Sequence, residues 1–278
     1  MVKILLIILL YIIILWVFAV APAFTSSKKK APFTGRNFAH RGLYEKDQSI
    51  PENCLEAFKN AVGAGYGMEL DVQLSLDGQV VVFHDDDLKR ACGVDKRVDE
   101  VSFEDLRKLK LFNTDHRIPL FSEVLSVVNG KEPLIVELKN GRRNKELCEK
   151  TLALLNDYDG EYCIESFNPL ITAWFRVHAP KIMRGFLSQM PEVYVKDGLS
   201  PLVGAILGRS LLNFLARPDF IAHKIGKRTV STDLALMLGA IKTGWTSHDP
   251  SSEKDHDIVI FEHYRPEIRF RNIKDREA

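Results

Sequence analysis

Short apolar segments that end in polar or charged residues recur along most of this chain, and most of them precede a stretch with helical periodicity. These segments occupy residues 37–40, 68–76, 80–84, 134–139, 162–167, 183–187, 220–222 and 240–246. About eight alternations of strand and helix over about 250 residues fit the arithmetic of a (β/α)8 TIM barrel, whereas a doubly wound open sheet gives similar local patterns. We therefore expect an α/β fold, with the closed barrel as the main interpretation.

Residues 4–23 form an uncharged apolar run of 20 residues. A helix of this length spans about 30 Å, the thickness of a bilayer core. Residues 19–21 (Ala-Val-Ala) imitate a signal-peptidase site, but Pro22 would follow the cut and the run is longer than the apolar part of a usual signal. We expect one retained transmembrane helix, with a cleaved signal as the alternative.

The side of the membrane is indicated by the basic residues next to this run. Lys3 alone precedes it, and the residues that follow it are Lys28, Lys29, Lys30 and Arg36. The positive-inside rule therefore favours a cytoplasmic body. Four cysteines without a close-spaced pair fit a reducing compartment, although scattered cysteines can also pair outside the cell.

The chain divides into two parts of unlike composition. Residues 1–30 contain four lysines and no acid, so the body, 31–278, carries 34 basic and 37 acidic residues. A hydrophobic content of 46%, only four cysteines and a near-neutral charge exclude a disordered chain, a disulfide scaffold and a strongly basic nucleic-acid binder. No low-complexity segment or Pro/Gly-rich linker divides the body. We expect a membrane anchor with a basic linker over 1–30 and one barrel domain over 31–278.

Two of the expected strands place carboxylates on a single face. Glu69 and Asp71 alternate with apolar residues, and Glu137 shares a face with Lys139 in the same way. A barrel strand turns its apolar face to the helices, so the three carboxylates are expected to converge inside. Buried carboxylates repel one another, and a hard cation such as Mg²⁺ or Ca²⁺ is the usual partner of an all-oxygen set. The alternatives are a solvated sheet face or an ion pair between Glu137 and Lys139.

Two histidines follow expected strands at the ends where barrel enzymes place catalytic groups, His40 and His84. Such a pair can donate one proton and accept another near neutral pH. Arg41 offers a planar fork for a phosphate, and Lys139 adds a second cationic donor. A single histidine at a strand end is more often a structural hydrogen-bonder, but the combination points to a phosphate site.

At these residues the sequence resembles the glycerophosphodiester phosphodiesterase family. The segments that carry the resemblance follow the family's order over residues 36–262 and are 40–42 (His-Arg-Gly), 51–53 (Pro-Glu-Asn), 69–72 (Glu-Leu-Asp-Val), 77–78 (Asp-Gly), 81–85 (Val-Val-Phe-His-Asp), 137–139 (Glu-Leu-Lys), 166–167 (Ser-Phe) and 245–246 (Trp-Thr). The resemblance implies a (β/α)8 barrel with one divalent cation that hydrolyses glycerophosphodiesters to glycerol 3-phosphate and an alcohol.

The resemblance also implies roles for particular residues. Glu69, Asp71 and Glu137 would hold the cation, and His40 and His84 would be the general acid/base pair. The remaining residues that it implies are two phosphate contacts, Arg41 and Lys139, a supporting acid, Glu52, and two pocket-lining aromatics, Phe167 and Trp245. His248 is expected in a solvent-exposed loop, outside the catalytic set.

The substrate's alcohol is indicated only by residues 199–215, an apolar segment richer in leucine and isoleucine than a barrel helix requires. One interpretation is a buried helix that covers the sheet. The other is a second membrane contact beside the barrel mouth, which would favour lysophospholipids and a lysophospholipase D activity. A non-catalytic module that binds phosphoglycerol groups is the alternative from another class, although a binder has no need of an acid/base pair.

Overall fold

The computed structural model describes residues 1–270, so the last eight residues of the expected barrel domain lie outside the described residues. The strands are β1 (Arg36–Ala39), β2 (Gly67–Leu74), β3 (Val80–Val82), β4 (Leu134–Leu138), β5 (Tyr162–Ser166), β6 (Met183–Ser188), β7 (Phe220–Lys224), β8 (Ile241–Ser247) and β9 (Ile258–Phe261). The α-helices are α1 (Val2–Val20), α2 (Ser27–Lys30), α3 (Leu55–Ala64), α4 (Lys89–Cys92), α5 (Phe103–Leu106), α6 (Phe121–Val128), α7 (Asn144–Asn156), α8 (Pro169–His178), α9 (Pro191–Lys196), α10 (Pro201–Gly208), α11 (Asn213–Ala216) and α12 (Val230–Met237). Three 3-10 turns complete them: η1 (Val98–Glu100), η2 (Leu111–Asn113) and η3 (Pro250–Lys254).

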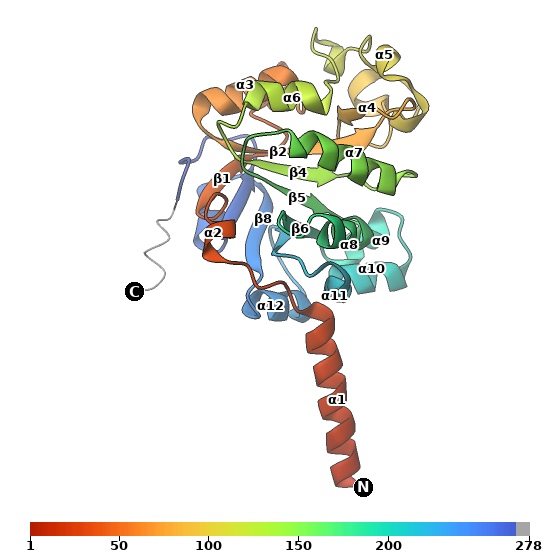
Figure 1. Ribbon diagram of the computed structural model, residues 1–278, viewed down its shortest axis with the longest axis vertical. Helices are drawn as coiled ribbons and strands as arrows, with labels where there is room; N and C mark the ends of the chain where they lie inside the picture. Colours follow the sequence, from red (N-terminus) through yellow and green to blue (C-terminus); the bar gives the residue numbers. More distant parts are fainter. Residues whose placement is uncertain (271–278) are drawn as a thin grey trace.

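Eight parallel strands close into a barrel. They follow the order β1-β9-β8-β7-β6-β5-β4-β2, and β1 pairs with β2 to complete the circle. Helices cover the outside of this sheet, as Figure 1 shows. The expected α/β TIM barrel is therefore confirmed, and the open-sheet alternative is excluded.

One expected barrel strand lies outside the barrel. The segment 80–84 contains β3, which runs antiparallel to β2 with Val82 opposite Val72. Only residues 75–79 join the two strands, and a parallel pair needs a crossover of about a dozen residues or more. The barrel's remaining strand is β9, an apolar run of four residues that was not among the expected strands.

The barrel strands alternate between an outer apolar face and an inner face with two levels. Leu70 of β2 and Val136 of β4 pack outward in one cluster with Phe58 of α3 and Phe121 of α6. The lower inner level is apolar and consists of Phe38, Ile135, Cys163, Met183, Phe220 and Ile258. The buried carboxylates of Glu69, Asp71 and Glu137 lie on the same inner face of these strands.

Two helical segments end at residues with a left-handed backbone or at a turn. The helix α3 has Cys54 as its N-cap and continues through Gly63 to a left-handed Gly65. Asn53 does not cap it, because its side chain is hydrogen-bonded elsewhere. The segment 199–215 is not a single helix, since α10 ends at Gly208 and the chain turns through Ser210, at φ 55°, before α11 begins.

The helix α1 is the one described helix that is long and apolar enough to cross a membrane. It projects away from the barrel in Figure 1 and leaves it beside α11 and α12. From Val2 to Leu15 its apolar side chains are exposed, whereas Val20 is fully buried. Its free part is therefore hydrophobic on every side, and its last turn belongs to the folded body.

Candidate active site

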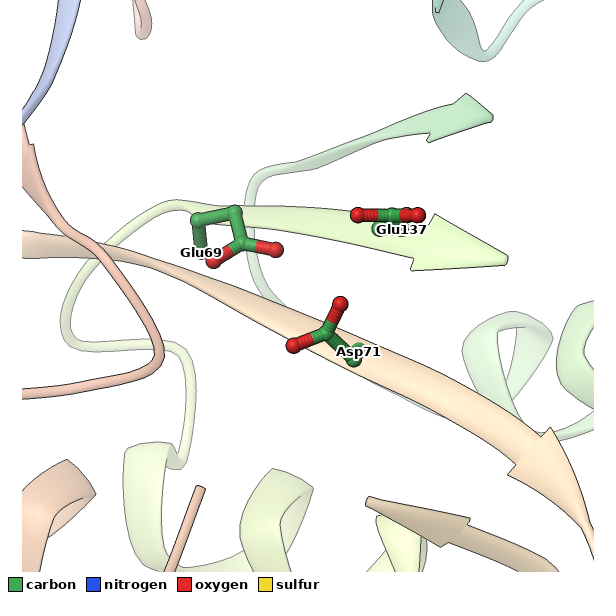
Figure 2. A group of neighbouring side chains, drawn as sticks. All are labelled: Glu69, Asp71 and Glu137. Atoms are coloured by element: carbon green, nitrogen blue, oxygen red, sulfur yellow. The ribbon is translucent and has the colours of Figure 1, made fainter. Parts of the chain in front are cut away.

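Three carboxylates converge inside the barrel. Glu69 and Asp71 come from β2 and Glu137 from its neighbour β4, where Asp71 lies opposite Glu137 (Figure 2). One carboxylate oxygen from each lies within 4.8 Å of the others, and all three residues are buried. The sequence predicts that alternate side chains of these strands point into the barrel, and the three carboxylates lie together there as expected.

The charges of this trio are only partly balanced. Burial and the neighbouring carboxylates of Asp71 and Glu137 raise the pKa of Glu69 well above its usual value. Burial also raises the pKa of Glu137, against the lowering effect of Lys139. Burial acts in the same direction on Asp71, but the positive charges of Lys139 and other neighbours hold its pKa below the usual range. A divalent cation among these oxygens would remove the repulsion.

Two cationic side chains border the trio. Lys139 Nζ lies 3.0 Å from Glu137 Oε1 and 3.4 Å from Asp71 Oδ1. The Arg41 guanidinium donates to Glu52 Oε1 over 2.8 Å, and its Nε lies 3.6 Å from Asp71 Oδ2. The ion pair between Glu137 and Lys139 that the sequence left as an alternative is present, and it coexists with the carboxylate trio.

The turn after β1 positions Arg41. Arg41 and Gly42 both have left-handed backbones, at φ 53° and 81°, so the chain reverses sharply there. This turn aims the Arg41 backbone N–H at Glu69 Oε2, 3.0 Å away. The adjoining segment adds Asn53, whose Nδ2 donates to Asp71 Oδ2 over 2.8 Å. Two of the trio's carboxylates are thus fixed by donors from one loop region.

His40 lies at the end of β1 with its two ring nitrogens in different surroundings. Nδ1 is 2.7 Å from Glu262 Oε2, and Nε2 is 3.9 Å from Glu69 Oε2. Burial opposes ionisation of Glu262, but hydrogen bonds from His40 and Tyr44 lower its pKa to about 2. An ionised acceptor requires a proton on Nδ1. Burial, followed by the charge of Arg41, lowers the pKa of His40, so its Nε2 carries a free lone pair at neutral pH.

His84 reaches the site by the β2–β3 hairpin. β3 runs back alongside β2, and the Phe83 backbone N–H donates to the carbonyl oxygen of Asp71 over 3.0 Å, which brings the next residue to the level of the carboxylates. His84 Nδ1 lies 2.7 Å from Asp85 Oδ1. Arg90 links Asp85 to Glu52, with Nη2 2.6 Å from Glu52 Oε1. The hairpin therefore holds His84 through a chain of charged groups.

A cavity of about 550 Å³ opens above these residues. Its walls include both histidines, Arg41, Lys139, Glu69 and Glu137. On one side the wall is aromatic, because the ring of Phe167 meets Trp245 and Tyr194 edge to face with centroids 5.8 and 6.2 Å away. The expected lining by Phe167 and Trp245 is present. Glu52 does not line the cavity and lies behind Arg41, and the side chain of His248 is exposed, as expected.

Sequence reasoning missed two acidic residues of this region. Glu165 on β5 lies opposite Glu137, is buried, and its Oε2 accepts no hydrogen bond. Burial and the charge of Glu137 raise its pKa well above the usual value. It alternates with Ile164, which packs outward in the same cluster as Val136, and this is the same signal that marked Glu137. Glu262 had no such signal, because it follows the strand that was not expected.

The model of the glycerophosphoryl diester phosphodiesterase family matches residues 40–256, which include most of the barrel and of the cavity. The chain belongs to this family. The resemblance read from the sequence motifs is thereby confirmed.

Several curated relatives of this family resemble the chain. A lysophospholipase D of Rattus norvegicus is 34% identical over 154 residues, which are 51% of this chain and 47% of that protein. A glycerophosphodiester phosphodiesterase of Caldanaerobacter subterraneus subsp. tengcongensis is 33% identical over 162 residues, 54% of this chain and 65% of that protein. The chain thus covers less than two thirds of the length of either relative.

Solved structures of the family share the fold. A phosphodiesterase of Oleispira antarctica, in complex with the product sn-glycerol-3-phosphate, superposes with a TM-score of 0.66 at 23% identity, covering 82% of this chain and 93% of that one. A glycerophosphodiester phosphodiesterase of Thermotoga maritima gives a TM-score of 0.60 at 23% identity, covering 81% of this chain and 93% of that one. At these identities the likeness concerns the barrel itself.

Proposed function

We propose that this protein is a phosphoric diester hydrolase that splits glycerophosphodiesters into glycerol 3-phosphate and an alcohol. The observation that carries the proposal is the convergence of three buried carboxylates, two histidines and two cationic side chains on one cavity. Family membership and relatives with this activity in their names support it. The match covers 47% and 65% of the length of the two relatives named above.

Glu69, Asp71 and Glu137 are the proposed ligands of one divalent cation, Mg²⁺ or Ca²⁺. The donor set fits such an ion because it consists only of carboxylate oxygens, lies within 4.8 Å, and includes a buried Asp71 Oδ1 that accepts no hydrogen bond. When bound, the ion supplies Lewis-acid neutralisation of phosphoryl charge and lowers the pKa of a coordinated hydroxyl.

The remaining steps belong to the chain's own side chains. Arg41 and Lys139 are proposed to bind the phosphoryl oxygens and offset their charge. His40 Nε2, which holds a lone pair, is the proposed base for the attacking hydroxyl, either water or a neighbouring glycerol hydroxyl. His84, supported by the carboxylate of Asp85, is the proposed acid for the departing alkoxide. Phe167 and Trp245 are proposed to pack against the substrate.

The test uses the full chain and glycerophosphocholine. We expect release of glycerol 3-phosphate that EDTA abolishes, and a fall in kcat of about 10²- to 10⁴-fold in His40→Ala and in His84→Ala. His178→Ala, at an exposed histidine at the end of α8, is the matched control and should leave kcat unchanged. Equal rates in wild type and both site variants would refute the histidine pair, and no turnover by the wild type would favour a non-catalytic phosphoglycerol-binding module. Equal rates with and without EDTA would refute the cation.

A second candidate reaction is lysophospholipase D cleavage, favoured by the apolar side of the cavity. Leu199 and Tyr194 of the α9–α10 segment line it together with Phe167 and Trp245. This wall can accept an acyl chain, and a relative with this activity in its name is 34% identical. Higher kcat/KM for lysophosphatidylcholine than for glycerophosphocholine would select this reaction, and the reverse ratio would select the soluble diester.

Residues 1–30 are proposed to be a retained membrane anchor with its linker, and the barrel to begin near residue 31. Retention is supported by Val20, which packs against Ile221 and accepts a hydrogen bond at its carbonyl oxygen from Asn213 over 2.9 Å. Cleavage after Ala21 would remove these contacts. The intact mass of the protein extracted from membranes should be 31.6 kDa, and a mass lacking residues 1–21 would refute retention.

A cytoplasmic body is the proposed topology. It rests on the excess of basic residues after α1. Protease added to sealed, right-side-out vesicles should leave the barrel intact, and rapid digestion would place it outside.

A further inference from the structure

Contacts from two directions fix the angle at which α1 leaves the barrel. On one side, Trp16 Nε1 donates to Ser231 Oγ of α12 over 3.0 Å. On the other side is Arg217, the residue that follows α11. Its Nη1 donates to the carbonyl oxygens of Phe18 and Ala21 over 2.9 and 2.8 Å. The Arg217 guanidinium also lies 4.5 Å from the Phe18 ring centroid. These contacts therefore fix the position of the surrounding protein surface along the axis of α1.

Apolar side chains are exposed on α12 next to the exit. Val230, Leu234 and Met237 lie on one face of the helix, at i, i+4 and i+7. Val230 is 74% exposed and Met237 84% exposed, whereas Leu234 packs partly against the cluster that contains Val20. One stripe of α12 thus continues the hydrophobic surface of α1 onto the body.

The start of α10 adds two further exposed apolar side chains. Leu202 and Val203 are 71% and 41% exposed. The end of the same helix is tied to the start of α12, because Thr229 Oγ1 donates to the carbonyl oxygen of Gly208 over 3.1 Å. Figure 1 shows α10, α11 and α12 together on the side of the barrel from which α1 departs.

Two cations stand where α10 meets α12. Arg209 follows α10 and Lys227 precedes α12, and both are exposed. Among the described residues, neither forms an ion pair with a carboxylate. Protein surfaces that lie in the headgroup region of an anionic bilayer combine exposed apolar side chains with cations that have no acidic partner.

We propose that this collar, consisting of Leu202, Val203, Arg209, Lys227, Val230 and Met237, rests in the headgroup region of the bilayer that α1 enters. The inference rests on the proposed membrane location of α1 and is independent of the proposed hydrolysis. Its consequence is a fixed orientation of the barrel. The α9–α10 segment, which lines the cavity at Tyr194 and Leu199, then lies between the cavity and the lipid.

The test places single nitroxide labels on the full chain in nanodiscs of phosphatidylcholine and phosphatidylglycerol. Labels at Leu202→Cys and Val230→Cys probe the collar, and a label at Ile8→Cys reports the anchor. Leu76→Cys is the matched control, because Leu76 is 57% exposed on the β2–β3 hairpin and β2 is four strands away from β7 in either direction. Cys92→Ser serves as the background, since the other three cysteines are buried.

The expected result is a several-fold lower accessibility to a water-soluble nickel chelate at 202 and 230 than at 76, with oxygen accessibility raised as in lipid. Equal chelate accessibility at 202, 230 and 76, with position 8 protected, would overturn the collar and leave the anchor standing. Dipolar broadening between labels at 230 would also overturn it, because a second copy would then cover the surface. Protected collar labels on a protein that hydrolyses nothing would refute the proposed reaction alone.

Discussion

At the residue scale, burial and the charge of Arg41 lower the pKa of His40, and Glu262 opposes both effects. Its carboxylate raises the pKa of His40 through a hydrogen bond and through charge, against burial and Arg41. In Glu262→Gln the amide oxygen still accepts from Nδ1, but the charge is lost, so the pKa of His40 falls. A neutral base is then retained to lower pH, and the acidic limb of the kcat/KM profile should move to lower pH. The imidazolium formed during reaction loses its counter-ion, so kcat should fall about 10- to 100-fold.

The control for this prediction is Tyr44→Phe. It removes the other hydrogen bond to the same carboxylate, at 2.9 Å, and leaves the His40 contact in place. Its acidic limb should stay close to that of the wild type. A Glu262→Gln profile with an unmoved limb and unchanged kcat would show that Glu262 has only a structural role.

A second residue-scale prediction concerns the carboxylate trio. A cation that binds the folded chain alone stabilises it by mass action, by about 2.7 kcal/mol at a hundred times its Kd. EDTA-treated protein should therefore gain thermal stability on addition of Mg²⁺ or Ca²⁺, as measured by calorimetry. Glu137→Gln should lose most of this gain. Glu149→Gln, at an exposed carboxylate of α7, should keep it, and a gain of equal size in Glu137→Gln would remove Glu137 from the ligand set.

At the scale of elements, the alternation of side chains made the trio predictable, because β2 and β4 carry a full inside–outside pattern. The local pattern of apolar and polar residues did not determine which strands are neighbours in the sheet. The segment 80–84 was expected as a barrel strand because its pattern resembles any barrel strand in isolation, although the five-residue connection to β2 is too short for a parallel pair. β9 was not among the expected strands, so the position of Glu262 became visible only in the closed barrel.

The turn after β1 gives an element-scale prediction. Gly42 has φ 81°, and an added Cβ would lie 3.0 Å from the Ala57 backbone and side chain. Gly42→Ala should lose about 2 kcal/mol in urea unfolding, because a left-handed alanine costs about 1–2 kcal/mol and the contact adds to this. Gly63→Ala, in open space within α3, should gain about 0.5–1 kcal/mol. Equal stability of the two variants would mean that the turn relaxes freely.

At the scale of the whole molecule, anchor and barrel are joined by a buried carboxylate. Asp219 is 1% exposed and precedes β7, and it accepts hydrogen bonds from Lys29 Nζ at 2.9 Å and from Thr25 Oγ1 at 2.7 Å. The expected boundary between residues 30 and 31 therefore separates Lys29 from its partner. Basic residues after a membrane span are ordinarily used only to predict which side of the membrane the protein lies on. Composition does not indicate that one of them, Lys29, forms an ion pair with a buried carboxylate of the barrel.

This joint can be tested by Lys29→Met, which keeps the length of the side chain and removes its charge. Breaking a buried ion pair costs about 3–5 kcal/mol. Asp219 retains the hydrogen bond from the Arg184 backbone N–H at 3.0 Å, and the Lys29 side chain is 23% exposed, so about 2 kcal/mol is the expected loss in unfolding free energy. Lys28→Met, at an exposed neighbour, should stay within about 0.5 kcal/mol of the wild type. Equal stability of the two variants would show that linker and barrel fold independently, and the barrel would then be tethered to α1 instead of fixed upon it.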